Sequence, residues 1–466
     1  MKHTKDMSVG SPLVALILFS LPIILGNLFQ QFYNLMDIAI VGNKLGDDAL
    51  AAVGATAALY GLFLSLAFGA ANGFSLVIAR YFGSKDIKGL HKAFAHALKL
   101  AILIAVILTV VALFFTRPLL QLLHTPDVEL SYRYISVVLL GITVTVFYNT
   151  LSSVLRAVGN SVAPLIFLII GAFVNVGLDF AFIVLFDMGV FGAGLATVIS
   201  QVVSCTLTAV YILFFCKDLL PSREDFVHDS ALTKDLLVNA ASMACMFSIV
   251  SIGSITLQFA VNNLGPSIIA AHTTARKIDE TMMVVFAPLS MASATFASQN
   301  MGAGKTDRIR RGIITAFLLG FAISLVTIFI TFAFGEYLVK RISGSNNPEV
   351  IAQGFRFLKW NLPFYFFLVG LVILRSTLQS IGVKITPLIA SFVEMIGKAS
   401  IAFFLVPRMG YFGIIISEPI IWFVCSSIVG VSFVIEILKM NKTAYAKHLW
   451  KQTYQKPILQ KVKQRA

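Results

Sequence analysis

The sequence alternates between long apolar runs and short polar turns along nearly its whole length. The runs Ala101 to Phe115 and Ile313 to Phe334 contain no charged residue. With their flanks they reach the roughly 20 residues that a helix needs to cross about 30 Å of hydrocarbon. They are continuous and lack the alternation of apolar and polar residues that lipid-facing β-strands show. The pattern therefore predicts membrane-spanning helices rather than a β-barrel.

The polar turns divide the chain into twelve predicted spans. Composition agrees, because 58% of the residues are hydrophobic, only 12% are charged and the mean hydropathy is +0.88, which excludes a water-soluble globular domain. We therefore expect an all-α integral membrane protein. The spans are placed at residues 13–41, 50–79, 93–116, 131–155, 162–186, 192–216, 237–261, 268–299, 312–334, 350–378, 385–406 and 411–438.

The charged residues between the spans predict the orientation. With both termini in the cytoplasm, the cytoplasmic segments hold 23 Lys and Arg residues, and the outer loops together with the adjoining span ends hold 8. This asymmetry fits the positive-inside rule and predicts a multi-pass protein of the cell membrane. The net charge of +14 lies largely in cytoplasmic loops and a basic tail, where anionic lipid head groups supply the opposite charge. Membrane lipids are therefore the expected partners, and nucleic acid is not.

The two halves of the sequence resemble each other. Asn43 to Gly46 recurs as Asn262 to Gly265, and Gly83 recurs as Gly302, both displaced by 219 residues. Each half holds six spans, so both enter the membrane from the same side. The two six-helix lobes are expected to be related by a pseudo-two-fold axis along the membrane normal. We divide the chain into a cytoplasmic N-terminus (1–12), an N-terminal lobe (13–216), a cytoplasmic linker (217–236), a C-terminal lobe (237–438) and a basic cytoplasmic tail (439–466).

Ionisable residues inside the first lobe are candidates for an ion site, because burying one in a membrane costs roughly 2.5 to 3.5 kcal/mol. Asn175 and Asp179 are four residues apart and share one face of the fifth span. If Asp37 of the first span faces them, two carboxylates and an amide form an oxygen-rich site that could hold Na⁺ or share a proton. The alternative is that both acids are simply hydrated near the interface.

The second lobe offers Glu394 and Lys398, one helical turn apart. This pair either neutralises itself and stabilises the fold or forms a proton or substrate site. Glu280 and Glu418 are further candidates for lining a cavity, against a hydrated or packing role. Pro22, on the span that carries Asp37, marks a kink that either couples bending to ion binding or is static.

Gly302 to Thr306 resembles the end of a phosphate-binding loop, but Gln299 stands where such a loop needs glycine and no strand precedes it. We interpret it as a cytoplasmic turn. No nucleophile, base or metal cluster with catalytic spacing is evident, so the sequence predicts neither an enzyme nor a cofactor.

Two segments resemble signatures of bacterial multidrug and toxic compound extrusion (MATE) transporters. The first is Gln30 to Gly42 followed by Gly46 and Ala49 to Gly54, and the second runs from Arg156 through Pro164 to Asp179. The resemblance implies an antiporter that exchanges inward Na⁺ or H⁺ for outward movement of cationic, often aromatic drugs. It also implies that Asp37, Asn175 and Asp179 hold the coupling cation. We expect the protein to be a monomer.

In the same family some members use acids on the seventh and tenth spans. This sequence has Gln258 on the seventh span and no acid within the membrane part of the tenth. That difference directs attention to Glu394 and Lys398, and Gln31 is a further candidate for the cavity wall. Transporters with two such lobes bind solute between them and expose it alternately to either side. A flippase for lipid-linked cell-wall or polysaccharide precursors is the alternative, but it would need more cations in the cavity. A channel or scaffold would leave Asp37 and Asp179 unexplained.

Overall fold

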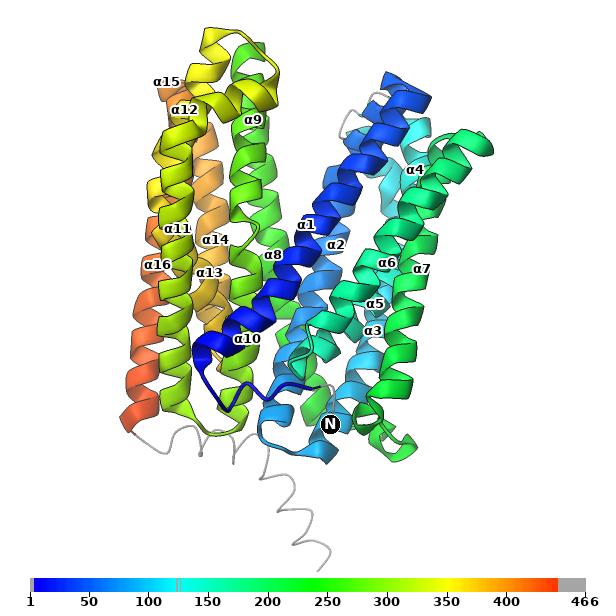
Figure 1. Ribbon diagram of the computed structural model, residues 1–466, viewed down its shortest axis with the longest axis vertical. Coiled ribbons are helices and arrows are strands. Elements are labelled where there is room, and N and C mark those ends of the chain that lie inside the picture. The colour runs from blue at the N-terminus through cyan, green and yellow to red at the C-terminus, as the bar shows by residue number, and fades with distance from the viewer. Residues whose placement is uncertain (1–3, 123–124, 126, 443–466) are drawn as a thin grey trace, which may run out of the picture. The chain divides into compact units, whose positions relative to one another are not determined.

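The computed structural model describes residues 4–122, 125 and 127–442, and every regular element among them is a helix (Figure 1). Eleven helices are long and apolar enough to cross a membrane, and one bent pair completes a twelfth span. The predicted all-α membrane protein with twelve spans is thus confirmed. The predicted basic tail lies almost wholly outside the described residues.

The first six spans contain several helices that extend beyond the predicted apolar runs. The fourth span is bent by 42° between its two helices, next to Gly141. The elements are α1 (Pro12–Leu45), α2 (Asp47–Gly83), α3 (Ile87–Leu122), α4 (Val128–Leu140), α5 (Ile142–Ala157), α6 (Val162–Asp179) with the π-helix η1 (Phe180–Leu185), and α7 (Gly189–Phe215).

The other six spans follow two short 3-10 turns. These turns, η2 (Lys217–Leu219) and η3 (Arg223–Phe226), lie in the predicted linker. The remaining elements are α8 (Ser230–Asn262), α9 (Pro266–Met283), α10 (Phe286–Gly302), α11 (Thr306–Ser343), α12 (Pro348–Asn361), the 3-10 turn η4 (Leu362–Phe364), α13 (Tyr365–Ser380), α14 (Ile385–Ser400), the π-helix η5 (Ile401–Leu405), α15 (Val406–Met409) and α16 (Tyr411–Lys442).

The helices form two compact units. Among the described residues, unit 1 is built mainly from Phe19–Ile78 and Asp86–Ser248, and unit 2 from Asp6–Leu18, Ala79–Lys85 and residues 249–442. In unit 1, α7 packs against α4, α5 and α6. In unit 2, α16 packs against α13 and α14, and α11 lies beside α13 (Figure 1).

The duplication extends to an irregularity that the sequence did not predict. The π-helix η1 starts directly after Asp179, and η5 occupies the matching place in the second half, directly after Ser400. A π-helix widens the turn by one residue and occurs often at functional sites. In the first half, it begins directly after a candidate ion ligand.

Pro22, which the sequence predicted to mark a kink, and three further prolines lie in different settings. The helices α1 and α16 continue through Pro22 and Pro419. In contrast, Pro363 lies within the 3-10 turn η4, and the break between α9 and α10 comes shortly before Pro288.

Gly83 and Gly302, the matching glycines of the two halves, lie where two helix ends touch inside unit 2. A Cβ atom on Gly83 would lie 1.9 Å from the carbonyl oxygen of Gln299. One on Gly302 would lie 1.9 Å from the carbonyl oxygen of Arg80. Each helix end thus presents its main chain to the other, and the close approach requires glycine at both positions.

We expect Gly83→Ala and Gly302→Ala each to destabilise the protein by on the order of 3 kcal/mol, because a methyl group would push two main chains apart. Thermal unfolding in detergent measures the effect. Gly61→Ala in α2 is the control, since a Cβ there meets nothing within 4 Å. If Gly83→Ala unfolds at the same temperature as Gly61→Ala, the two helix ends do not pack in this way.

The segment before α1 is part of the folded core of unit 2. Met7 is 1% exposed, and its main-chain N–H donates to Oε1 of Gln299 at 2.8 Å. Its carbonyl oxygen accepts from Nδ2 of Asn300 at 3.3 Å. Both partners are fully buried at the end of α10, so the segment supplies main-chain hydrogen bonds to two buried polar side chains.

The turn that resembles a phosphate-binding loop holds the same segment. Lys305 donates from Nζ to the carbonyl oxygen of Ser8 at 2.8 Å, and Arg308 donates from Nη2 to that of Val9 at 2.8 Å. The lysine that would contact a nucleotide phosphate in a true loop therefore binds main-chain carbonyl groups here.

Candidate functional site

Asp37 lies in α1 and Asp179 is the last residue of α6, and both belong to unit 1. One helical turn beyond them, Val41 and Ile183 are both fully buried in one hydrophobic cluster, together with Ala49, Val190 and Ala193. This cluster packs the end of α1 against η1, which begins directly after Asp179. The turns that carry the two acids therefore lie in the same region of unit 1.

The polar atoms of this region are buried and unpaired. Asp179 is fully buried and Asn175 is 2% exposed. Among the described residues, Oδ1 of Asp37, both carboxylate oxygens of Asp179 and both polar atoms of the Asn175 amide lack a hydrogen-bond partner. Leaving one such polar group buried and unpaired costs about 1–3 kcal/mol. A ligand that binds the four oxygen atoms of Asp37, Asp179 and Asn175 would remove this cost.

The electrostatics of the region favour a cation. The charge of Asp37 acts on Asp179, and Tyr134 of α4 lies within electrostatic reach of both carboxylates. Two carboxylates in a poorly solvated place repel each other unless a cation or a proton lies between them. Oxygen ligands suit a hard cation. The donor set therefore fits Na⁺ or a shared proton, while Gln31 is exposed on α1.

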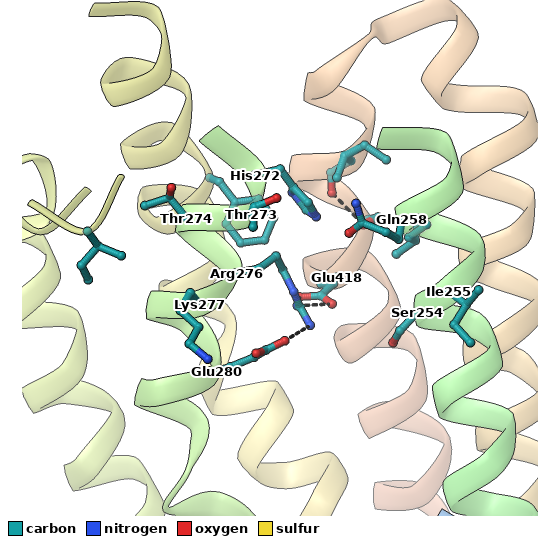
Figure 2. Close-up of a pocket in the computed structure, with 15 residues that line it drawn as sticks. Ser254, Ile255, Gln258, His272, Thr273, Thr274, Arg276, Lys277, Glu280 and Glu418 are labelled. Carbon is teal, nitrogen blue, oxygen red and sulfur yellow. Dashed lines mark hydrogen bonds and ion pairs between the residues drawn. The ribbon is translucent and has the colours of Figure 1, made fainter. Parts of the chain in front are cut away.

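Unit 2 contains a cavity of about 560 Å³ between α8, α9 and α16 (Figure 2). Its wall is mixed, with aromatic, amide and charged groups. The polar residues that line it include Ser254, Gln258, His272, Arg276, Glu280 and Glu418. The side chain of Gln258, the seventh-span residue, donates from Nε2 to Oδ1 of Asn262 at 2.9 Å.

Arg276 links the two acids that the sequence proposed for a cavity wall. Its Nη1 atom lies 2.9 Å and 3.1 Å from the two carboxylate oxygens of Glu418. Its Nη2 atom lies 3.5 Å from Oε1 of Glu280, on the next turn of α9. Figure 2 shows both side chains directed toward the guanidinium. The pairing of Arg276 with Glu418 joins residues 142 positions apart, so the sequence could not predict it.

Asp279 completes this group, and the sequence did not single it out. Its Oδ2 lies 3.3 Å from Nη1 of Arg276, and its Oδ1 accepts from the Tyr365 hydroxyl at 2.6 Å. Its side chain is fully buried. The available signal was its position three residues after Arg276, on the same face of α9.

Glu394 and Lys398 lie in a separate buried cluster. The Nζ atom of Lys398 lies 3.1 Å from Oε1 of Glu394 and 3.2 Å from the hydroxyl of Ser254. Oε2 of Glu394 lies 2.8 Å from Nη2 of Arg375 on α13. Both carboxylate oxygens of Glu394 are thus occupied, unlike those of Asp179.

Comparison with known proteins extends these observations. The MatE family model matches residues 22–181 and 242–404, one segment in each half. The probable multidrug resistance protein YpnP of Bacillus subtilis is 27% identical over 396 residues, which are 84% of this chain and 87% of that protein. The probable multidrug resistance protein YoeA of the same organism is 26% identical over 415 residues, 86% of this chain and 89% of that one.

A solved structure has the same fold. It is a MOP superfamily transporter from Pyrococcus furiosus, 25% identical, with a TM-score of 0.88 over 95% of this chain and 100% of that chain. The family model covers well over half of the sequence and matches both halves. Together with the twelve apolar spans, this match identifies the protein as a multi-pass membrane transporter of the MatE (multidrug and toxic compound extrusion) family.

Proposed function

We propose that this protein exports cationic or aromatic organic compounds across the cell membrane in exchange for Na⁺ or H⁺, with Asp37, Asn175 and Asp179 holding the coupling cation. The main support is the group of buried oxygen atoms without partners on these three residues. A group of buried acids with no internal counter-ion is costly to maintain unless an ion binds there during function.

The coupling follows from electrostatics. Without a cation, the carboxylates of Asp37 and Asp179 repel each other, and a bound cation or proton removes that repulsion. The ion therefore changes the relative free energy of arrangements in which α1 and α6 pack differently. A ligand can shift such an equilibrium only by its difference in affinity for the two states. The helix α1 also carries Pro22, which lacks one main-chain hydrogen bond and lowers the cost of bending there.

The direct test is efflux from proteoliposomes loaded with ethidium, a fluorescent aromatic cation. An imposed Na⁺ gradient and an imposed pH gradient are applied in separate experiments. We expect one of them to drive ethidium movement against its own gradient. Ethidium movement that ignores both gradients would contradict the coupling.

We also place both termini in the cytoplasm, on the basis of the Lys and Arg asymmetry. In a variant whose four native cysteines are replaced by alanine, Asn346→Cys is expected to react with a membrane-impermeant maleimide in intact cells. Arg223→Cys, exposed near η3, is expected to react only after the cells are opened. The reverse pattern of labelling would overturn the orientation.

A further inference from the structure

The cavity of unit 2 contains a cation that belongs to the protein. The guanidinium of Arg276 contacts Glu418 at 2.9 Å, Asp279 at 3.3 Å and Glu280 at 3.5 Å. An arginine side chain stays charged at any physiological pH. Three carboxylates therefore surround one permanent positive charge in the wall of a cavity of about 560 Å³.

The charges of this cluster do not balance. Three carboxylates face Arg276, and Lys277 lines the same cavity without an ion pair among the described residues. By formal charge, the three acids outnumber Arg276 and Lys277 by one. A cavity with excess negative charge attracts a cation, and its low-dielectric walls strengthen that attraction.

The three acids are not held equally. Asp279 is fully buried and accepts a hydrogen bond from Tyr365. The Glu418 side chain is 9% exposed, whereas that of Glu280 is 51% exposed. Glu280 is therefore the acid that an entering solute meets first, and Glu418 is the acid that Arg276 binds most closely.

One wall of the same cavity is aromatic. His272 and Phe357 both line it, and their rings pack edge to face with their centroids 5.2 Å apart. His272 also contacts Tyr411, whose hydroxyl oxygen lies 3.3 Å from Nδ1 of His272. A flat organic cation that enters can contact these rings while its charge approaches the carboxylates.

From this arrangement we propose that Arg276 acts as a built-in competitor: its guanidinium occupies the carboxylate cluster of the cavity, and a cationic solute must displace it to bind there. Arg276 thereby lowers the affinity for singly charged solutes and favours those whose additional contacts offset the displacement. This inference rests on the proposed export of organic cations, and it assigns Arg276 a role in solute selection.

The test is equilibrium binding of ethidium to the purified protein in detergent, followed by ethidium fluorescence. Arg276→Ala removes the competitor, so the dissociation constant of ethidium is expected to fall about tenfold, within the range of coupling between two ligands. In Arg276→Ala, added guanidinium ion should occupy the position left by the arginine side chain and raise the dissociation constant of ethidium again. It should have no such effect on the original protein, where Arg276 already fills that place.

Controls separate this role from a structural one. Arg276→Lys keeps the charge but loses the forked contacts with Glu418 and Glu280, so its ethidium dissociation constant is expected to fall less than that of Arg276→Ala. Arg117→Ala removes an exposed arginine that pairs with Glu129 in unit 1, and it should change nothing. If Arg276→Ala does not fold, Arg276→Gln, which keeps a donor to Glu418, is expected to show the same fall.

The inference is overturned if a folded variant without the arginine binds ethidium equally or more weakly and ignores guanidinium ion. Absence of ethidium binding to the original protein and to the variants also overturns it. The measurement needs no ion gradient, so its failure is distinguishable from a failure of the cation coupling, which only the proteoliposome experiment addresses.

Discussion

Asp179→Asn is expected to abolish export while the protein still folds. Neither carboxylate oxygen of Asp179 has a partner among the described residues, so an amide of the same shape breaks no internal contact. It removes the negative charge that a coupling ion needs, and it cannot take up a proton at physiological pH. We expect ethidium efflux from cells to fall at least about tenfold, which corresponds to about 1.4 kcal/mol of lost interaction.

The matched control for this prediction is Asp187→Asn. Asp187 follows η1, is exposed and has a φ of 51°, a backbone conformation that asparagine also adopts readily. Its efflux should equal that of the original protein at equal amounts in the membrane. Asp37→Asn should behave like Asp179→Asn, and undiminished efflux in either variant would remove these residues from the coupling site.

Glu394→Gln is expected to destabilise the protein strongly, because it leaves the charges of Arg375 and Lys398 buried without their carboxylate. The side chains of all three residues are at most 8% exposed. Breaking a buried ion pair by removing one partner costs about 3–5 kcal/mol. Thermal unfolding in detergent should therefore show a large drop in the unfolding temperature.

A comparison with an exposed ion pair tests this interpretation. Glu436→Gln removes the partner of Lys439, whose side chain is 53% exposed, and the expected loss is about 0–1 kcal/mol. Replacing Glu394, Arg375 and Lys398 together by leucine or methionine should recover much of the stability, because no unpaired charge is left. If Glu394→Gln loses no more than Glu436→Gln, the cluster does not stabilise the fold.

The spans could be predicted from the sequence because each one depends on a local property. A run of apolar residues must form a helix in a membrane whatever lies around it. The internal duplication was equally visible, because Gly83 and Gly302 are separated by the same 219 residues as Asn43 and Asn262. Why both positions are glycine became clear only in the structure, where each glycine lies against the main chain of the other helix end.

The candidate sites were predicted only where the partners are close in sequence. Asn175 with Asp179 and Glu394 with Lys398 follow from helical periodicity. Arg276 with Glu418 does not, because tertiary packing brings them together from 142 positions apart. The π-helix after Asp179 also escaped prediction, since the local sequence contains no signal that separates it from a regular helix.

The buried segment before α1 has a consequence for biosynthesis. Met7 is synthesised well before its partner Gln299, which lies 292 positions later. Chains are made at about 5–20 residues per second, so Met7 waits many seconds before Gln299, Asn300, Lys305 and Arg308 are synthesised. Docking of this segment can therefore report that the chain has been made through the end of α10 and the turn that follows it.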